Sequence, residues 1–91
     1  MTNVEQFESI TKSMLETFKA KNSDYGNSFD NTCDRFGLVA AVTRMFDKME
    51  RLAQFVIKGS FEVNESVKDT LLDLANYCIL TYMWICKKEK N

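Results

Sequence analysis

The chain has 91 residues, a formal net charge of −1, no proline and only three glycines. This length allows one domain, residues 1–91, whose small core a partner subunit would complete. The charge argues against non-specific binding to a nucleic acid polymer, and the shortage of turn residues argues against a sheet.

The first predicted helix runs from about Asn3 to Lys21. Thr2 or Asn3 can cap it, and its apolar stripe is formed by Phe7, Ile10, Met14 and Phe18. Residues 22–28 hold six turn-forming residues in seven and predict a loop. Residues 29–35 are expected to hold a short helical turn.

The second predicted helix runs from about Gly37 to Lys58, and Gly59 is expected to end it. Its apolar residues follow a heptad spacing, which predicts one packing seam. The seam consists of Leu38, Val42, Met45, Met49, Leu52 and Val56.

The third predicted helix starts after Asn64, the expected N-cap, and runs to about Lys88. Its segment from Cys78 to Cys86 is apolar on all sides, so it should be buried all round. Three helices cannot surround one of their own members. We therefore expect an all-α bundle of three to four helices, completed by a homo-oligomer, a dimer or larger, through this segment.

Targeting and redox features are consistent with the cytoplasm. The N-terminal residues lack the basic and apolar parts of a secretory signal, and the segment from Cys78 to Cys86 is too short to span a membrane. The three cysteines, at positions 33, 78 and 86, form no CxxC pair, and the chain has no histidine. We interpret them as reduced thiols.

Two charged stripes are candidates for a site. Arg44, Lys48 and Arg51 lie along one face of the second helix. The third helix carries a second stripe, formed by Glu65, Asp69, Asp73 and Asn76. Charged stripes are usually solvated, but Leu72, Leu80 and Trp84 share the side of the aspartates. The two stripes either pair as an internal ion network or jointly line a pocket.

Such a pocket would suit a nucleotide. Arginine and lysine bind phosphate, and paired aspartates can hold Mg²⁺ together with substrate phosphates. Tyr25 lies in the polar segment next to Gly26, where the backbone can approach a ligand closely. Phe29 and Trp84 could stack on a base, although aromatic residues more often pack in a core.

The chain resembles the nucleotide modification associated domain family, whose members are common in phages and prophages. Three blocks in order carry the resemblance, over about residues 15 to 85. They read K-x-x-D-Y-G-x-S from Lys21, R-x-x-D-K-x-x-R-L from Arg44 and E-S-x-x-D-T-x-x-D-L-A-N-Y from Glu65. The resemblance implies an all-helical fold and a link to nucleotide metabolism.

The blocks are also similar to the MazG-like NTP pyrophosphatases, which are all-helical oligomers and hold magnesium with acidic pairs on two helices. The residues here that would hold Mg²⁺ in such an enzyme are Glu50, Glu65, Asp69 and Asp73. However, the acidic spacing on the third helix is four instead of three, and Lys48 and Arg51 replace acidic positions. These cations weaken metal binding and favour phosphate.

Three functions follow from these residues. The first is a protein that binds a nucleotide or nucleotide-derived signal without hydrolysis, as a phage protein sequestering a host messenger would. Its ligand-binding residues would be Tyr25, Arg44, Lys48, Arg51, Asp69, Asp73 and Asn76. The second is a Mg²⁺-dependent nucleotide pyrophosphatase, and the third is a structural helical oligomer.

Overall fold

The computed structural model describes residues 1–25, 27–59 and 65–90, and their side chains except those of Asp24, Tyr25 and Glu65. These residues form four helices and no strand, which confirms the all-α prediction. The helices are α1 (Asn3–Tyr25), α2 (Ser28–Phe36), α3 (Leu38–Lys58) and α4 (Glu65–Glu89). In this described part of the chain, every helix is too short or too polar to cross a membrane.

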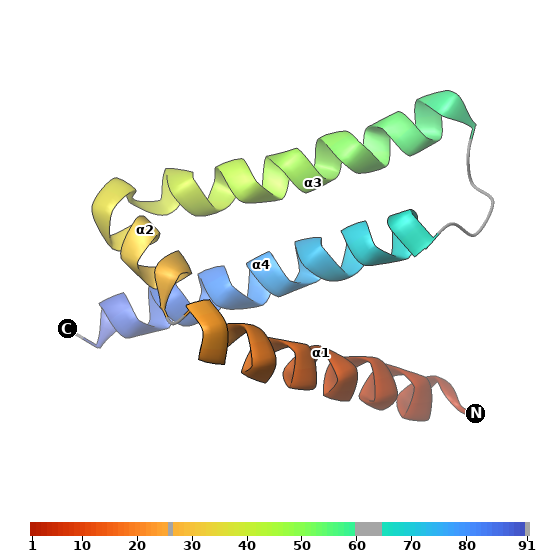
Figure 1. Cartoon of the computed structure of the whole chain (residues 1–91), viewed down its shortest axis with the longest axis horizontal. Helices are drawn as coiled ribbons and strands as arrows, with labels where there is room; N and C mark the ends of the chain where they lie inside the picture. Colours follow the sequence, from red (N-terminus) through yellow and green to blue (C-terminus); the bar gives the residue numbers. More distant parts are fainter. Residues whose placement is uncertain (26, 60–64, 91) are drawn as a thin grey trace.

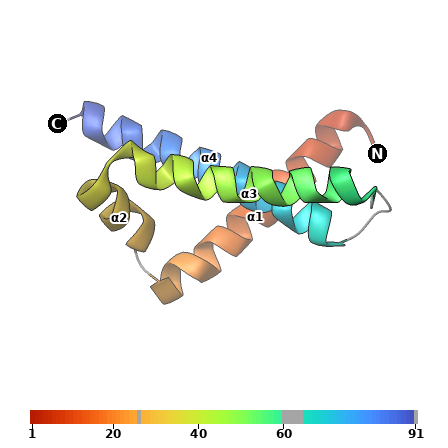
Figure 2. The same cartoon turned by 90° about the horizontal axis from the view of Figure 1, so that it is seen from above.

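The long helices α3 and α4 lie side by side and run in opposite directions (Figure 1). The short helix α2 lies at the end of this pair where α4 ends. Helix α1 lies on the other side of α4 and crosses it obliquely, as the second view shows (Figure 2). Helix α4 therefore has α3 along one side and α1 along another.

The helix boundaries agree with those predicted from the sequence except at the end of α1. The prediction that α1 stops at Lys21 is wrong, because the helix continues to Tyr25. No proline or glycine interrupts the chain before position 26, so the backbone hydrogen bonds of the helix can continue through residues that merely have a low helix propensity. The predicted N-cap, Asn64, lies outside the described residues.

The first turn of α1 is closed by a capping box. The Glu5 backbone N–H donates to Thr2 Oγ1 at 3.1 Å, and the Thr2 backbone N–H donates to Glu5 Oε1 at 3.0 Å. The hydrogen bond from the Thr2 backbone N–H, followed by one from the Thr2 side chain, favours the charged carboxylate and lowers the pKa of Glu5. The sequence-based prediction that Thr2 can cap this helix is thereby confirmed.

Two glycines adopt positive φ values at the ends of α3. Gly59 ends the helix in the left-handed conformation, with φ of 69° and ψ of 18°, as predicted. Gly37 separates α2 from α3 with φ of 84° and ψ of −171°, a region that is essentially restricted to glycine. Its N–H donates to the carbonyl of Cys33 at 2.7 Å, which closes the end of α2.

The predicted heptad seam of α3 is divided between two faces. Met45 and Leu52 are half-buried, but Leu38, Val42, Met49 and Val56 are exposed. The more buried side of α3 instead carries Ala41, Met45, Lys48, Leu52 and Phe55. Because apolar residues cover more than one side of this helix, a heptad pattern alone did not identify the side that packs on α4.

The core is small. Among the described residues, Cys33 and Ala41 are the buried apolar side chains, on α2 and α3 respectively. Thr70 and Thr81 of α4 are also buried, and their hydroxyls donate to the carbonyls of Ser66 and Tyr77 within the same helix. Burial, followed by the charges of Asp30 and Asp34, raises the pKa of the Cys33 thiol.

Candidate functional site

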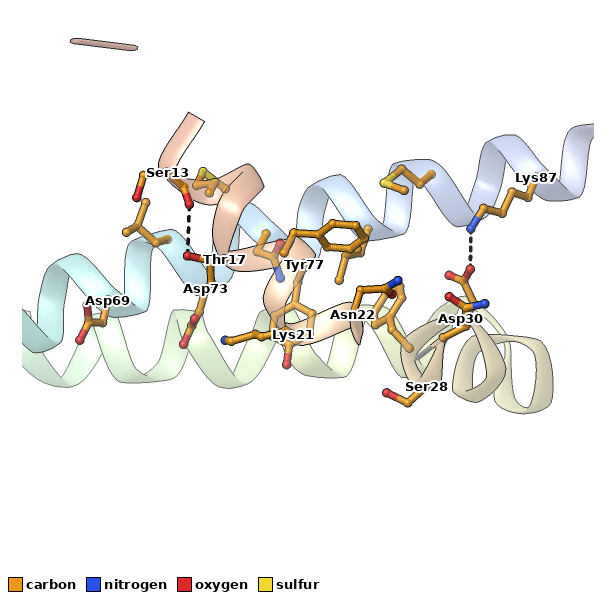
Figure 3. Close-up of a pocket in the computed structure, with 18 residues that line it drawn as sticks. Ser13, Thr17, Lys21, Asn22, Ser28, Asp30, Asp69, Asp73, Tyr77 and Lys87 are labelled. Carbon is orange, nitrogen blue, oxygen red and sulfur yellow. Dashed lines mark hydrogen bonds and ion pairs between the residues drawn. The ribbon is translucent and has the colours of Figure 1, made fainter. Parts of the chain in front are cut away.

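A cavity of about 620 Å³ lies between α1 and α4, and the start of α2 closes one end of it (Figure 3). Its volume falls within the range of small-molecule sites. The α1 wall carries Ser13, Thr17, Lys21 and Asn22 together with two apolar side chains. Asn27 and the first residues of α2 line the closed end.

The α4 wall combines polar and apolar side chains along one helical face. Their spacing of three and four residues places them on the same side of the helix. The residues are Asp69, Leu72, Asp73, Asn76, Tyr77, Leu80, Met83 and Lys87. Leu72 and Leu80 therefore line the same wall as the two aspartates.

An ion pair joins this wall to α3. Lys48 Nζ lies 3.4 Å from Asp73 Oδ2, and 4.0 Å from Asp47 Oδ2. The Lys48 side chain is only 14% exposed, whereas that of Asp73 is 45% exposed. Asp73 fits both interpretations of the charged stripes, the ion network and the pocket lining. Its carboxylate is paired with Lys48 of α3 and also lines the cavity.

The two arginines of the predicted cationic face lie elsewhere. Arg51 pairs with Asp47, with Nε 3.7 Å from Oδ2, and both side chains are exposed. Arg44 is exposed as well. Neither arginine is among the side chains that line the cavity.

Lys21 is the cation that sequence reasoning missed. It lines the cavity and extends from α1 toward the side of Asp73 (Figure 3). With the residues that the structure describes, Lys21 makes no ion pair, whereas Lys87 at the closed end is paired with Asp30. The available signal was its position as the first residue of the K-x-x-D-Y-G-x-S block.

The described side chains fit a magnesium ion poorly. Two carboxylates of the predicted metal set, Asp69 and Asp73, line the cavity one helical turn apart, and Lys48 neutralises one of them. Glu50 is exposed on α3 and does not line the cavity, and the side chain of Glu65 lies outside the described residues. In the described part of the chain, no three acidic, cysteine or histidine side chains are grouped to hold a metal.

The aromatic side chains have separate surroundings. The rings of Phe29 and Tyr77, both in the cavity wall, lie 6.0 Å apart at 36°. Trp84 is engaged elsewhere, because its Nε1–H donates to Asp34 Oδ1 at 2.9 Å. The side chain of Tyr25, the predicted contact near a base, is not among those described.

The α2 helix is held against the end of α4 by charge. Lys88 Nζ lies 2.9 Å from Asp34 Oδ1, and Lys87 pairs with Asp30. Hydrogen bonds from Lys88 and then from Trp84 lower the pKa of Asp34. These contacts connect the closed end of the cavity to the end of α4.

Comparisons with known proteins give a family match. A family model described as nucleotide modification associated domain 1 matches residues 21–85. No curated protein and no solved structure matches the chain. The matched segment begins at Lys21 and includes the whole α4 wall of the cavity up to Met83.

Proposed function

The chain belongs to the nucleotide modification associated domain 1 family, and we propose that the cavity between α1 and α4 binds a nucleotide or nucleotide-derived signal without hydrolysing it. The family name supports a nucleotide-related role. The further step, from that role to binding in this cavity, rests on the residues that line it.

One observation carries the proposal. Residues from the two ends of the family-matched segment line the same cavity, although they are about fifty positions apart in the sequence. Lys21, Asn22 and Ser28 come from the first block, and Asp69, Asp73 and Asn76 come from the third. The second block supplies Lys48, which pairs with Asp73.

The lining has the chemistry that a nucleotide requires. Lys21 supplies a cation for phosphate. Asn22 and Asn76 supply amide donors and acceptors for the edge of a base. Phe18, Leu72 and Leu80 supply an apolar surface for a ring. The cation in contact with phosphate is then Lys21, while Lys48 positions Asp73, and Arg44 and Arg51 remain outside the cavity.

Binding is favoured over hydrolysis by the charge around Asp73. A metal-dependent pyrophosphatase needs several carboxylates on its magnesium ions. Here Lys48 opposes a second cation at Asp73. A protein that holds its ligand intact acts by lowering the free concentration of that ligand, as a viral protein directed against a host messenger would.

The test is to incubate the purified protein with a panel of deoxynucleoside triphosphates, cyclic nucleotides and ADP-ribose-type nucleotides, with and without magnesium. Chromatography is then applied to the free fraction and to the fraction released by heat. We expect intact ligand that appears only after heating, and equal retention without magnesium.

Two outcomes would overturn the proposal. Magnesium-dependent conversion of a triphosphate to its monophosphate, abolished in Asp69→Asn and Asp73→Asn, would identify a pyrophosphatase instead. Retention of no member of the panel would leave the structural oligomer as the better interpretation.

A further inference from the structure

Helices α3 and α4 share an exposed apolar surface on the side away from the Lys48–Asp73 ion pair. We call it the bare face, and all of its side chains are exposed. Phe46 is 64% exposed and Tyr82 is 72% exposed. The bare face consists of Val39, Val42, Phe46, Met49 and Val56 of α3 with Leu71, Cys78, Tyr82 and Ile85 of α4.

Two contacts between α3 and α4 fix the position of this face. Cys78 Sγ donates to Met45 Sδ at 3.6 Å, on the same side of the helix pair as the bare face by helical spacing. The Lys48–Asp73 ion pair lies on the opposite side, next to the cavity. The apolar side chains that α3 and α4 contribute to the bare face therefore adjoin each other and form one continuous surface.

The bare face carries no charge over four turns of each helix. Between Val39 and Val56 this side of α3 is apolar apart from Glu50, which lies at its edge one turn after Phe46. Between Leu71 and Ile85 the positions that helical spacing places on this side of α4 are apolar, tyrosine or cysteine. Depletion of charge with enrichment of aromatic residues and methionine is typical of the centre of a protein–protein interface, above all in homodimers. Charged partners such as nucleic acids have nothing to bind there.

The exposed area of the chain is large enough for a stable interface. The accessible surface is 7255 Å², whereas a folded monomer of 10.6 kDa exposes about 5,500 Å². This excess belongs to the whole chain, including exposed apolar side chains of α1 such as Val4 and Phe7, and about half of it would match the roughly 800 Å² that each partner buries in a standard interface. An apolar surface of this kind rarely stays exposed on a monomer.

We propose that the bare face binds the bare face of a second copy of this chain, so that the α3–α4 pairs of the two copies form a four-helix bundle. A second copy is the fitting partner because the surface is uncharged and a two-fold dimer pairs a patch with itself. The two cavities then lie on opposite outer sides of the dimer, and each opens away from the interface.

Light scattering after size-exclusion chromatography tests the oligomeric state of the full chain. The wild type should elute as a dimer at micromolar concentration. Phe46→Glu, which places a charge in the bare face, should elute as a monomer. Gln54→Glu adds the same charge to an exposed position of α3 outside the bare face and should stay dimeric.

Thiol labelling of the wild type gives a second readout that needs no variant to fold. Cys78 is exposed in a single chain, so a dimer through the bare face should protect it from iodoacetamide until the protein unfolds. A monomeric wild type, a Phe46→Glu variant that stays dimeric, or rapid labelling of native Cys78 would each overturn the proposal. None of these results depends on nucleotide binding.

Discussion

The ammonium group of Lys48 lies 3.4 Å from the carboxylate of Asp73, and this contact ties α3 to the wall of the cavity. The Lys48 ammonium therefore lies on the α3 side of the Asp73 carboxylate, which also lines the cavity. In our interpretation Lys48 acts on the ligand through Asp73, whose position and charge it controls. This relationship can be measured separately from ligand binding.

A double-mutant cycle should give a coupling of about 1 kcal/mol between Lys48 and Asp73, because one partner is largely buried. The variants are Lys48→Met, Asp73→Asn and their combination, and the free energy of unfolding is measured in urea. The exposed pair of Glu16 and Lys19, at 3.6 Å, is the control and should couple by less than about 0.5 kcal/mol. Equal couplings in the two cycles would refute the special role of Lys48.

Replacement of Lys21 by methionine should weaken binding of the retained nucleotide about tenfold, since a hydrogen bond to a charged group is lost. Titration calorimetry measures the change. Lys19→Met provides the control on the same helix, because Lys19 does not line the cavity. A larger loss in Arg51→Met than in Lys21→Met would move the phosphate site to the exposed side of α3.

The two glycines with positive φ should differ in their tolerance of alanine. Gly37→Ala should cost about 2 kcal/mol, because its conformation is nearly restricted to glycine. Gly59→Ala should cost about 1 kcal/mol, the ordinary cost of the left-handed region. An added Cβ meets no atom within 4 Å at either position, so the difference in unfolding free energy reports the backbone alone. Equal costs would contradict this.

The contribution of Asp34 to the stability of the folded chain should decrease at low pH. Its folded-state pKa is lowered, first by Lys88 and then by Trp84. The stabilisation is therefore fully present above the ordinary aspartate pKa of about 3.9 and is lost as the pH falls through the folded-state value. The difference in thermal midpoint between wild type and Asp34→Asn should be constant from about pH 5 to 7 and shrink below about pH 4.

The control for this experiment is Lys88→Gln, which removes the main cause of the shift. In that background the Asp34→Asn difference should become smaller and less dependent on pH. A difference that grows as the solution becomes more acidic would show that Asp34 does not stabilise the folded chain as a carboxylate.

Local chemistry made much of the fold predictable. Thr2 and Gly59 act within a single turn of helix, so their roles follow from their own residue types and neighbours. The end of α1 was predicted too early because turn-forming residues were given more weight than the absence of a helix-breaking residue. The continuation to Tyr25 and the side of α3 that packs on α4 required the structure.

The site was predictable only in part, because it depends on how helices cross. Asp69, Asp73 and Asn76 share one face by spacing, and the sequence places them together. Which cations reach that face depends on the rotation of α3 and the path of α1. Apolar residues on two sides of α3 left its rotation undetermined, so Arg44 and Lys48 could not be separated, and Lys21 was not considered.

Nuclear magnetic resonance of the isotope-labelled chain tests the location of the site most directly. The deoxynucleoside triphosphates, cyclic nucleotides and ADP-ribose-type nucleotides of the retention panel are added one at a time. We predict that one of them shifts the amide signals of Lys21, Asn22 and Asn76 and leaves that of Ile57 unchanged. Shifts confined to Arg44 and Arg51, or no shift with any nucleotide, would contradict a nucleotide site between α1 and α4.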